Sequence, residues 1–292
     1  MEGIYNQEQN NSTNSGNFVN GNGNSTGNTT NNIQIVTSGL SYSDVKEICL
    51  DLFKANFIEL KREANKVIEE RVNEFIESYI ESIKNKNIET LEELKNPDMQ
   101  YILYEGQKSY ARYGSKELLD RLIFLLTERT AEVEKNMIQL NLNEAITIVH
   151  KMTEKQNNLI TIAFILNQTT WPNVQNIEGL LTNIKNQVIP FIPKDKEIRR
   201  DLEYLTYLGC GNSLLGDKLE DILKKEYPSI FEDIEDIRTY LIDKLPEIEA
   251  LFELWNDKEL YTYNLTTVGL TIGWANFSNK LNINADLDIW LK

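Results

Sequence analysis

The sequence predicts an all-α protein with a long amphipathic helix near its N-terminus and a small β element near its C-terminus. Residues 41–86 contain neither Gly nor Pro, and apolar residues recur there every three or four positions, as on one face of a helix. Further segments with helical periodicity follow along the chain. Near the C-terminus, residues 260–265 alternate apolar and polar positions, which predicts a short strand.

The predicted N-terminal helix extends from Ser41 to Lys86. Ser41 is suited to be its N-cap, because Asp44 follows at the third helical position. Such a helix would reach roughly 65 Å, so it needs partners along its whole length or a break near Asn65. Two interpretations remain open. It is a long core helix of a helical domain, or it is a coiled coil that joins copies of the chain.

The first 38 residues form a low-complexity tail rich in Asn, Gly, Ser and Thr, without any Lys or Arg. A segment with so little to bury is expected to be disordered. The alternative is self-pairing β structure, because Asn side chains stack well between copies of the same strand. The end of the tail favours pairing, since polar and β-branched residues alternate there. These residues are Asn32, Ile33, Gln34, Ile35 and Val36.

The rest of the chain divides into two predicted helical parts, a body over 39–193 and a module over 194–292. Pro190 and Pro193 bracket the turn between them. In the body, helices are expected at 88–94, 99–113, 115–134, 143–156, 159–168 and 177–188. In the module, they are expected at 198–208, 219–227, 230–245 and 247–255, followed by the strand and by a final helix that carries Trp274.

Composition limits the classes of partner. The net charge of -15, from 45 acidic and 30 basic residues, disfavours nucleic acid, and no basic patch offsets it. No stretch of eighteen apolar residues predicts a membrane span, and no signal peptide is recognised at the N-terminus. Cys49 and Cys210 lie in apolar sequence and are predicted to be buried thiols of a cytoplasmic protein.

The residue types needed for catalysis are not gathered in any recognised pattern. His150 is the single histidine, and no His/Cys spacing predicts a metal site. No nucleophile turn and no glycine-rich phosphate loop is found. Acidic pairs such as Glu232–Asp233 are expected to be a solvated helix face. We therefore predict a protein that is not an enzyme and that uses no cofactor and no metal.

Three segments resemble a poorly characterised bacterial helical family whose members often carry an Asn/Gly-rich tail. They are GLSYSDVKEI with DLFKANF over 39–57, YLTYLGC over 204–210, and LTTVGLTIGWAN over 265–276. The last also resembles the closing segment of winged-helix-like modules in abortive-infection proteins. Trp274 departs from the family pattern, where a smaller or polar residue is expected. The resemblance implies a cytoplasmic bacterial protein linked to anti-phage defence, and it carries over no catalytic residue.

These observations lead to one functional expectation and one alternative. We expect a self-assembling protein of a bacterial defence or signalling system, a homo-oligomer whose acidic C-terminal module contacts a protein partner, for instance one encoded by a neighbouring gene. The alternative is an effector that acts on membranes after activation. The residues predicted to carry self-association are Asn32, Ile33, Gln34, Ile35, Val36, Leu52, Phe53 and Phe57.

Overall fold

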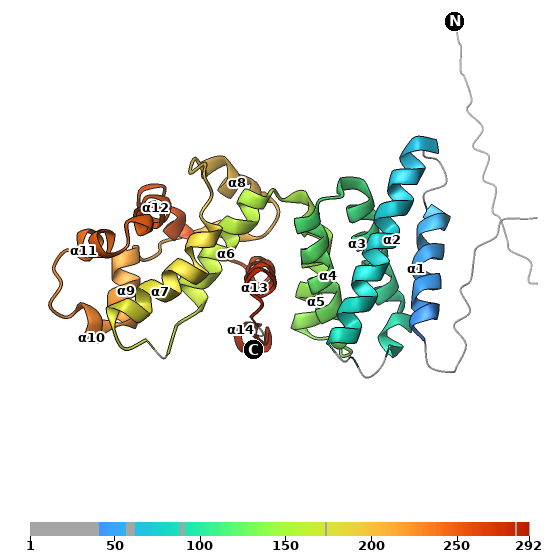
Figure 1. Cartoon of the computed structure of the whole chain (residues 1–292), viewed down its shortest axis with the longest axis horizontal. Helices are drawn as coiled ribbons and strands as arrows, with labels where there is room; N and C mark the ends of the chain where they lie inside the picture. The colour runs from blue at the N-terminus through green and yellow to red at the C-terminus, as the bar shows by residue number, and fades with distance from the viewer. Residues whose placement is uncertain are drawn as a thin grey trace, which may run out of the picture. The chain divides into compact units, whose positions relative to one another are not determined.

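The computed structural model describes residues 41–56, 62–86, 88, 91–172, 174–283 and 285–291. The described residues all belong to one compact unit. Almost all regular structure in the described part is helical, which confirms the all-α prediction (Figure 1). The tail residues predicted to pair as strands lie outside the described residues, and so does the choice between disorder and β structure.

The predicted single N-terminal helix is two helices, α1 (Tyr42–Asn56) and α2 (Arg62–Asn85). The two helices pack against each other, and both contact α3 (Pro97–Tyr113). Of the two possibilities that the sequence left open, partners along the whole length or a break near Asn65, the structure has the break, and it falls before Arg62 rather than at Asn65. A helix of that length would leave much of its apolar stripe without a partner, whereas two shorter helices bury their stripes against each other and the body.

Helices α3 and α4 (Lys116–Ala131) start within two residues of the predicted positions, where Asn96 and Ser115 cap them. Asn136 caps α5 (Met137–Ile148), and the prediction missed this cap. Two predictions were wrong in detail. The helix expected over 143–156 starts earlier and ends in the 3-10 turn η2 (Val149–Lys151), and the short helix expected at 88–94 is the 3-10 turn η1 (Glu92–Lys95).

Helices α6 (Glu154–Gln168) and α13 (Thr267–Leu281) form the most extensively packed pair of the fold. Helix α13 also contacts α4 and α5, so the last long helix of the chain joins the early helices to the later ones (Figure 1). Helix α6 starts earlier than predicted because Thr153 and Gln156 form a reciprocal capping box. Its predicted burial on most sides is confirmed, since Leu159 to Leu166 are all buried.

The remaining helices are short. The continuous helix expected over 230–245 is interrupted, because Asp236 caps a new helix in its middle. The remaining helical segments are α7 (Ile177–Gln187), η3 (Ile189–Phe191), α8 (Arg199–Tyr207), α9 (Leu219–Glu226), α10 (Pro228–Phe231), α11 (Ile237–Lys244), η4 (Pro246–Ile248), α12 (Glu249–Phe252), the π-helical turn η5 (Glu253–Asp257), η6 (Leu260–Thr262) and α14 (Asp288–Leu291).

The β element near the C-terminus consists of two antiparallel strands, β1 (Gly211–Ser213) and β2 (Tyr263–Leu265). Gly211 lies opposite Leu265, so strands about fifty residues apart in sequence meet. The predicted strand is thus confirmed over its second half, and its first half is the 3-10 turn η6. Contacts group residues 35–292 as one unit, and the boundary near Lys194 stays a prediction.

Candidate functional site

The residues predicted to carry self-association fall into two groups. Leu52 and Phe53 lie on α1, where Leu52 is half-buried and Phe53 is only 6% exposed in the core of this chain. Phe57 and the tail residues 32–36 lie outside the described residues. The structure therefore places Phe53 among the side chains that hold α1 to its own body, and the role of the group in association stays a prediction.

The outer face of α1 is polar. Lys46, Glu47, Asp51 and Lys54 are all exposed, while Val45, Cys49 and Phe53 on the opposite face are buried. Ser41 and Asp44 form the predicted cap, with the Ser41 backbone N–H donating to the Asp44 carboxylate at 2.8 Å. This first family-like segment therefore fixes the start of α1 and its packing, and the face that α1 leaves in solvent is charged.

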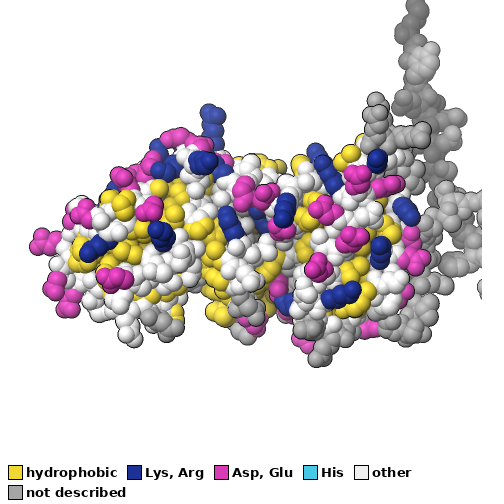
Figure 2. All heavy atoms as spheres, viewed as in Figure 1, with side chains coloured by type: hydrophobic (Ala, Val, Ile, Leu, Met, Phe, Trp, Pro, Cys, Tyr) yellow, Lys and Arg dark blue, Asp and Glu magenta, His cyan; other side chains and the backbone are white. Residues whose placement is uncertain are grey.

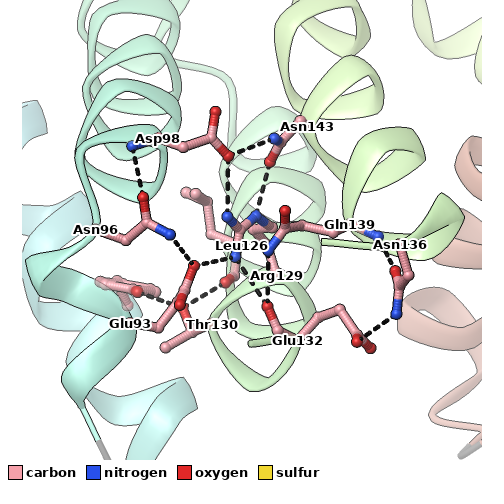
Figure 3. A network of polar contacts seen from close by, with 11 residues as sticks. Glu93, Asn96, Asp98, Leu126, Arg129, Thr130, Glu132, Asn136, Gln139 and Asn143 are labelled. Atoms are coloured by element: carbon pink, nitrogen blue, oxygen red, sulfur yellow. Dashed lines mark hydrogen bonds and ion pairs between the residues drawn. The ribbon is translucent and has the colours of Figure 1, made fainter. Parts of the chain in front are cut away.

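The most extensive polar arrangement of the described residues surrounds Arg129, whose side chain is fully buried on α4 (Figure 3). Its guanidinium donates to the Glu93 carboxylate at 2.8 Å, to Asp98 at 3.0 Å and to the side-chain oxygen of Asn143 at 2.8 Å. A further bond goes to the backbone carbonyl of Glu132 at 3.0 Å. These partners come from η1, α3, α5 and the end of α4, so one side chain connects four consecutive segments.

The carboxylates around Arg129 are held in turn by amide side chains. Asn96 donates to Glu93 at 3.2 Å, and its oxygen accepts the backbone N–H of Asp98 at 3.0 Å. Asn143 donates to Asp98 at 2.8 Å. Partial burial alone would raise the pKa of Asp98, but the hydrogen bonds from Asn143 and Arg129 and the guanidinium charge outweigh burial, so its pKa lies below the usual value.

This cluster, which we call the Arg129 cluster (Arg129, Glu93, Asn96, Asp98 and Asn143), is structural. None of its side-chain atoms is among the buried polar atoms that lack a partner in the described part of the chain. The sequence contained a signal for it, since Arg129 follows Leu122 and Leu126 by seven and three positions, on the apolar stripe of its helix. A charged residue on such a stripe predicts a buried ion pair.

The second and third family-like segments meet in space. The backbone N–H of Thr266 donates to the carbonyl of Cys210 at 3.0 Å, and the Thr266 hydroxyl donates to the carbonyl of Gly209 at 2.6 Å. Gly209 adopts a positive φ of 77°, which closes the end of α8. A Cβ atom on Gly269 would lie 1.8 Å from the carbonyl oxygen of Cys210. These glycines therefore allow the start of α13 to sit directly against the turn after α8.

The rest of the closing segment packs α13 onto α6. A Cβ atom on Gly273 would lie 2.7 Å from Cβ of Phe164, so the two helices approach as closely as a glycine permits. Asn276 donates to the hydroxyl of Thr161 at 2.8 Å inside this contact. Trp274, which departs from the family pattern, is 2% exposed and packs edge-on against Phe124 of α4. Its size fills the space between α13 and α4.

The reactive side chains of the chain are dispersed. Cys49 and Cys210 are both buried free thiols, as predicted, and burial raises the pKa of each to about 12. His150 lies in η2, where its ring stacks on Tyr113 at 5.8 Å between centroids. The described residues hold no group of three His, Cys, Asp or Glu side chains arranged to hold a metal ion.

One loop of the C-terminal module exposes apolar side chains while its backbone is fixed. Leu214 is 62% exposed and Leu215 is 98% exposed. The Leu214 N–H donates to the carbonyl of Thr262 at 2.8 Å, and the Trp255 indole donates to the carbonyl of Asp217 at 3.1 Å. We call residues 214–217 the Leu215 loop. These two hydrogen bonds attach the loop to the rest of the module on both sides of its exposed tip.

The fold is that of an all-α protein in which α13, near the end of the chain, packs against α4, α5 and α6. A family model matches residues 39–236 and 232–291, which together span the body and the C-terminal module. The chain therefore belongs to that family, which is uncharacterised. No curated protein and no solved structure matches the chain.

Proposed function

We propose that this protein is a non-enzymatic assembly protein of a bacterial defence or signalling system. In this proposal the tail brings copies together, and the C-terminal module contacts a protein partner. The observation that carries the proposal is the Leu215 loop, whose exposed apolar tip is hydrogen-bonded to the module on both sides. A preorganised apolar anchor lowers the entropy cost of binding another protein.

The tail is proposed as the element that joins copies of the chain. Its support comes from the sequence, in the alternating segment Asn32 to Val36, which lies outside the described residues. The polar outer face of α1 argues against a coiled coil formed by that face, because an association seam needs apolar residues. The assembly is therefore expected to depend on the tail and to leave the helical body intact.

The partner is proposed to be a protein with a basic surface around an apolar pocket. Acidic residues outnumber basic ones in residues 194–292, and Glu232, Asp233, Glu235 and Asp236 are all exposed. Figure 2 shows acidic side chains gathered at the end of the molecule formed by α10 and α11. Complementary charge would steer such a partner, while the Leu215 loop would supply the apolar contact.

The membrane-acting alternative would require α6 to leave its site. Leu159 to Leu166 are buried, and α6 is packed against α13 more extensively than any other pair of helices is packed. Among the described residues, no helix is long and apolar enough to cross a membrane. No observation specifically favours this alternative. Leakage of liposomes caused by the assembled protein would support it.

Light scattering on three proteins tests assembly. The full chain is expected to exceed its monomer mass of 33.8 kDa, while a truncated chain starting at Gly39 and the full-length double variant Ile33→Asp/Ile35→Asp are expected to be monomers. The full-length variant Thr29→Asp/Thr30→Asp is the matched control, because it adds the same charge outside the alternating segment. Monomers in all cases, or a control that also dissociates, would remove the assembly proposal.

The partner contact is tested on the same proteins with the product of the adjacent gene. Leu215→Asp is expected to weaken that complex at least tenfold, because it places a charge in the apolar contact. Val133→Asp is the control, since Val133 is also exposed, at 56%, but lies at the end of α4, far along the chain from the module. Equal effects of the two substitutions would show that the Leu215 loop is not the contact.

A further inference from the structure

A cavity of about 360 Å³ opens where two of the longer helices begin. Ser115 caps α4 and Thr153 caps α6, and both residues line this cavity. The first N–H groups of a helix have no partner within the helix; the two caps accept those of Leu118 and Gln156, and each helix N-terminus carries about half a positive charge. The cavity therefore lies in the positive field of two helices at once.

The second observation is a buried guanidinium that is only partly used. Arg121 is 5% exposed and lines the same cavity. Its Nη1 donates to the Glu154 carboxylate at 2.6 Å, and its Nε is buried without a hydrogen-bond partner. A guanidinium has five N–H donors, and within the described part of the chain this one contact is the only hydrogen bond of the Arg121 side chain. The Arg121 guanidinium therefore has N–H donors that no acceptor of the described residues uses.

The walls of the cavity determine the kind of acceptor. Tyr113 and His150 stack on each other, and with Leu118 they provide flat and apolar surface. Burial, followed by the charge of Lys151, lowers the pKa of His150, so its imidazole is neutral at pH 7. Glu117 also lines the cavity and would repel a multiply charged ion. A singly charged oxyanion with an apolar body fits these conditions.

We propose that this cavity binds a small carboxylic acid, whose carboxylate replaces Glu154 on Arg121 and faces the starts of α4 and α6. The apolar part of the ligand lies against Tyr113 and His150. A carboxylate accepts two parallel N–H bonds from a guanidinium, which matches the unused donors. The volume is at the lower end of the range for small-molecule sites, so the ligand is small. This site is independent of the proposed assembly.

The single histidine makes the test direct. In full-length protein labelled at histidine Cε1, one imidazole signal reports the cavity, because His150 is the only histidine of the chain. Benzoate is titrated at constant ionic strength and pH 7, with benzamide as the uncharged analogue of the same shape. The expected result is a saturable shift with benzoate and at least tenfold weaker binding of benzamide. A linear shift, or equal binding of the two compounds, would overturn the proposal.

Three variants locate the binding. Arg121→Gln is expected to abolish the saturable shift. Glu154→Gln is expected to bind benzoate at least threefold more tightly, because the competing carboxylate is gone. Glu178→Gln is the matched control, since Glu178 is in the first turn of α7 and is expected to bind as the natural protein does. If Arg121→Gln fails to fold, the comparison of Glu154→Gln with Glu178→Gln still decides, and equal affinity in these two contradicts the proposal.

Discussion

Arg129 is a charged side chain with no exposure at all, and it pairs with Glu93, which is 5% exposed. A buried pair of this kind contributes little net stability, because removing two charges from water costs about as much as their attraction returns. Removing only one partner is different, since it leaves a charge buried without compensation. The Arg129 cluster therefore fixes the relative positions of four segments, because η1, α3, α4 and α5 must all be in place for it to form.

At this scale we predict that Glu93→Gln lowers the free energy of unfolding by about 3 kcal/mol, because the Arg129 guanidinium loses its buried counter-charge. Urea unfolding at pH 7 measures the change. Glu203→Gln is the control, because its partner Arg199 has a 92% exposed side chain, and a loss below about 1 kcal/mol is expected there. Equal losses in the two variants would show that burial of the pair has no consequence.

The helices owe their boundaries to side-chain caps and their positions to a few close contacts. Asn96, Ser115, Asn136 and Thr153 each accept a backbone N–H at a helix start, and Asn, Ser and Thr are all preferred caps. Helices α6 and α13 approach closely where Gly273 faces Phe164 and Ile160. The missing side chain of Gly273 allows this close approach, which a helix cap does not determine.

For this pair of helices we predict that Gly273→Ala lowers the free energy of unfolding by about 1–3 kcal/mol, because the added methyl group would overpack the contact. Gly179→Ala is the matched control in α7, where the nearest atom to an added Cβ is the Asn176 side-chain oxygen at 3.2 Å. A change of less than about 1 kcal/mol is expected there. Thermal unfolding followed by circular dichroism measures both. A neutral Gly273→Ala would mean that α6 and α13 can separate without cost.

On the scale of the molecule, the described helices share one hydrophobic core. Phe124 of α4 contacts Trp274 of α13, and α13 also contacts α5 and α6. The early helices of the body therefore bury part of their surface against a helix from the end of the chain. A boundary near Lys194 separates these partners in sequence, but the core crosses it.

We accordingly predict a single cooperative unfolding transition for a chain comprising residues 39–292. Differential scanning calorimetry should give a calorimetric enthalpy equal to the van't Hoff enthalpy, as expected for two-state unfolding. A chain ending at Pro193 should lack this transition, because it lacks α13. Two resolved transitions in the longer chain would instead indicate that residues 39–193 and 194–292 are independent domains.

The sequence alone determined the class of the fold and the starts of several helices. Periodicity of apolar residues and caps such as Ser115 are local signals, so they can be interpreted without knowing what packs nearby. The same is true of the buried thiols Cys49 and Cys210, which were predicted from their apolar neighbours in sequence. The sequence analysis did not identify the Arg129 cluster: Arg129 lies on the apolar stripe of its helix, but no local pattern indicates its four partners.

The tertiary structure decided which distant segments meet. It divided the predicted N-terminal helix into α1 and α2, because a single helix could not bury its whole stripe. It placed Gly209 and Cys210 against Thr266 and Gly269, and it brought Glu154 at the start of α6 to Arg121 of α4. These last contacts join residues 33 to 59 positions apart, and their free energy depends on surfaces that exist only after folding. No local sequence pattern indicates which distant residues will meet, so these contacts could not be predicted from the sequence.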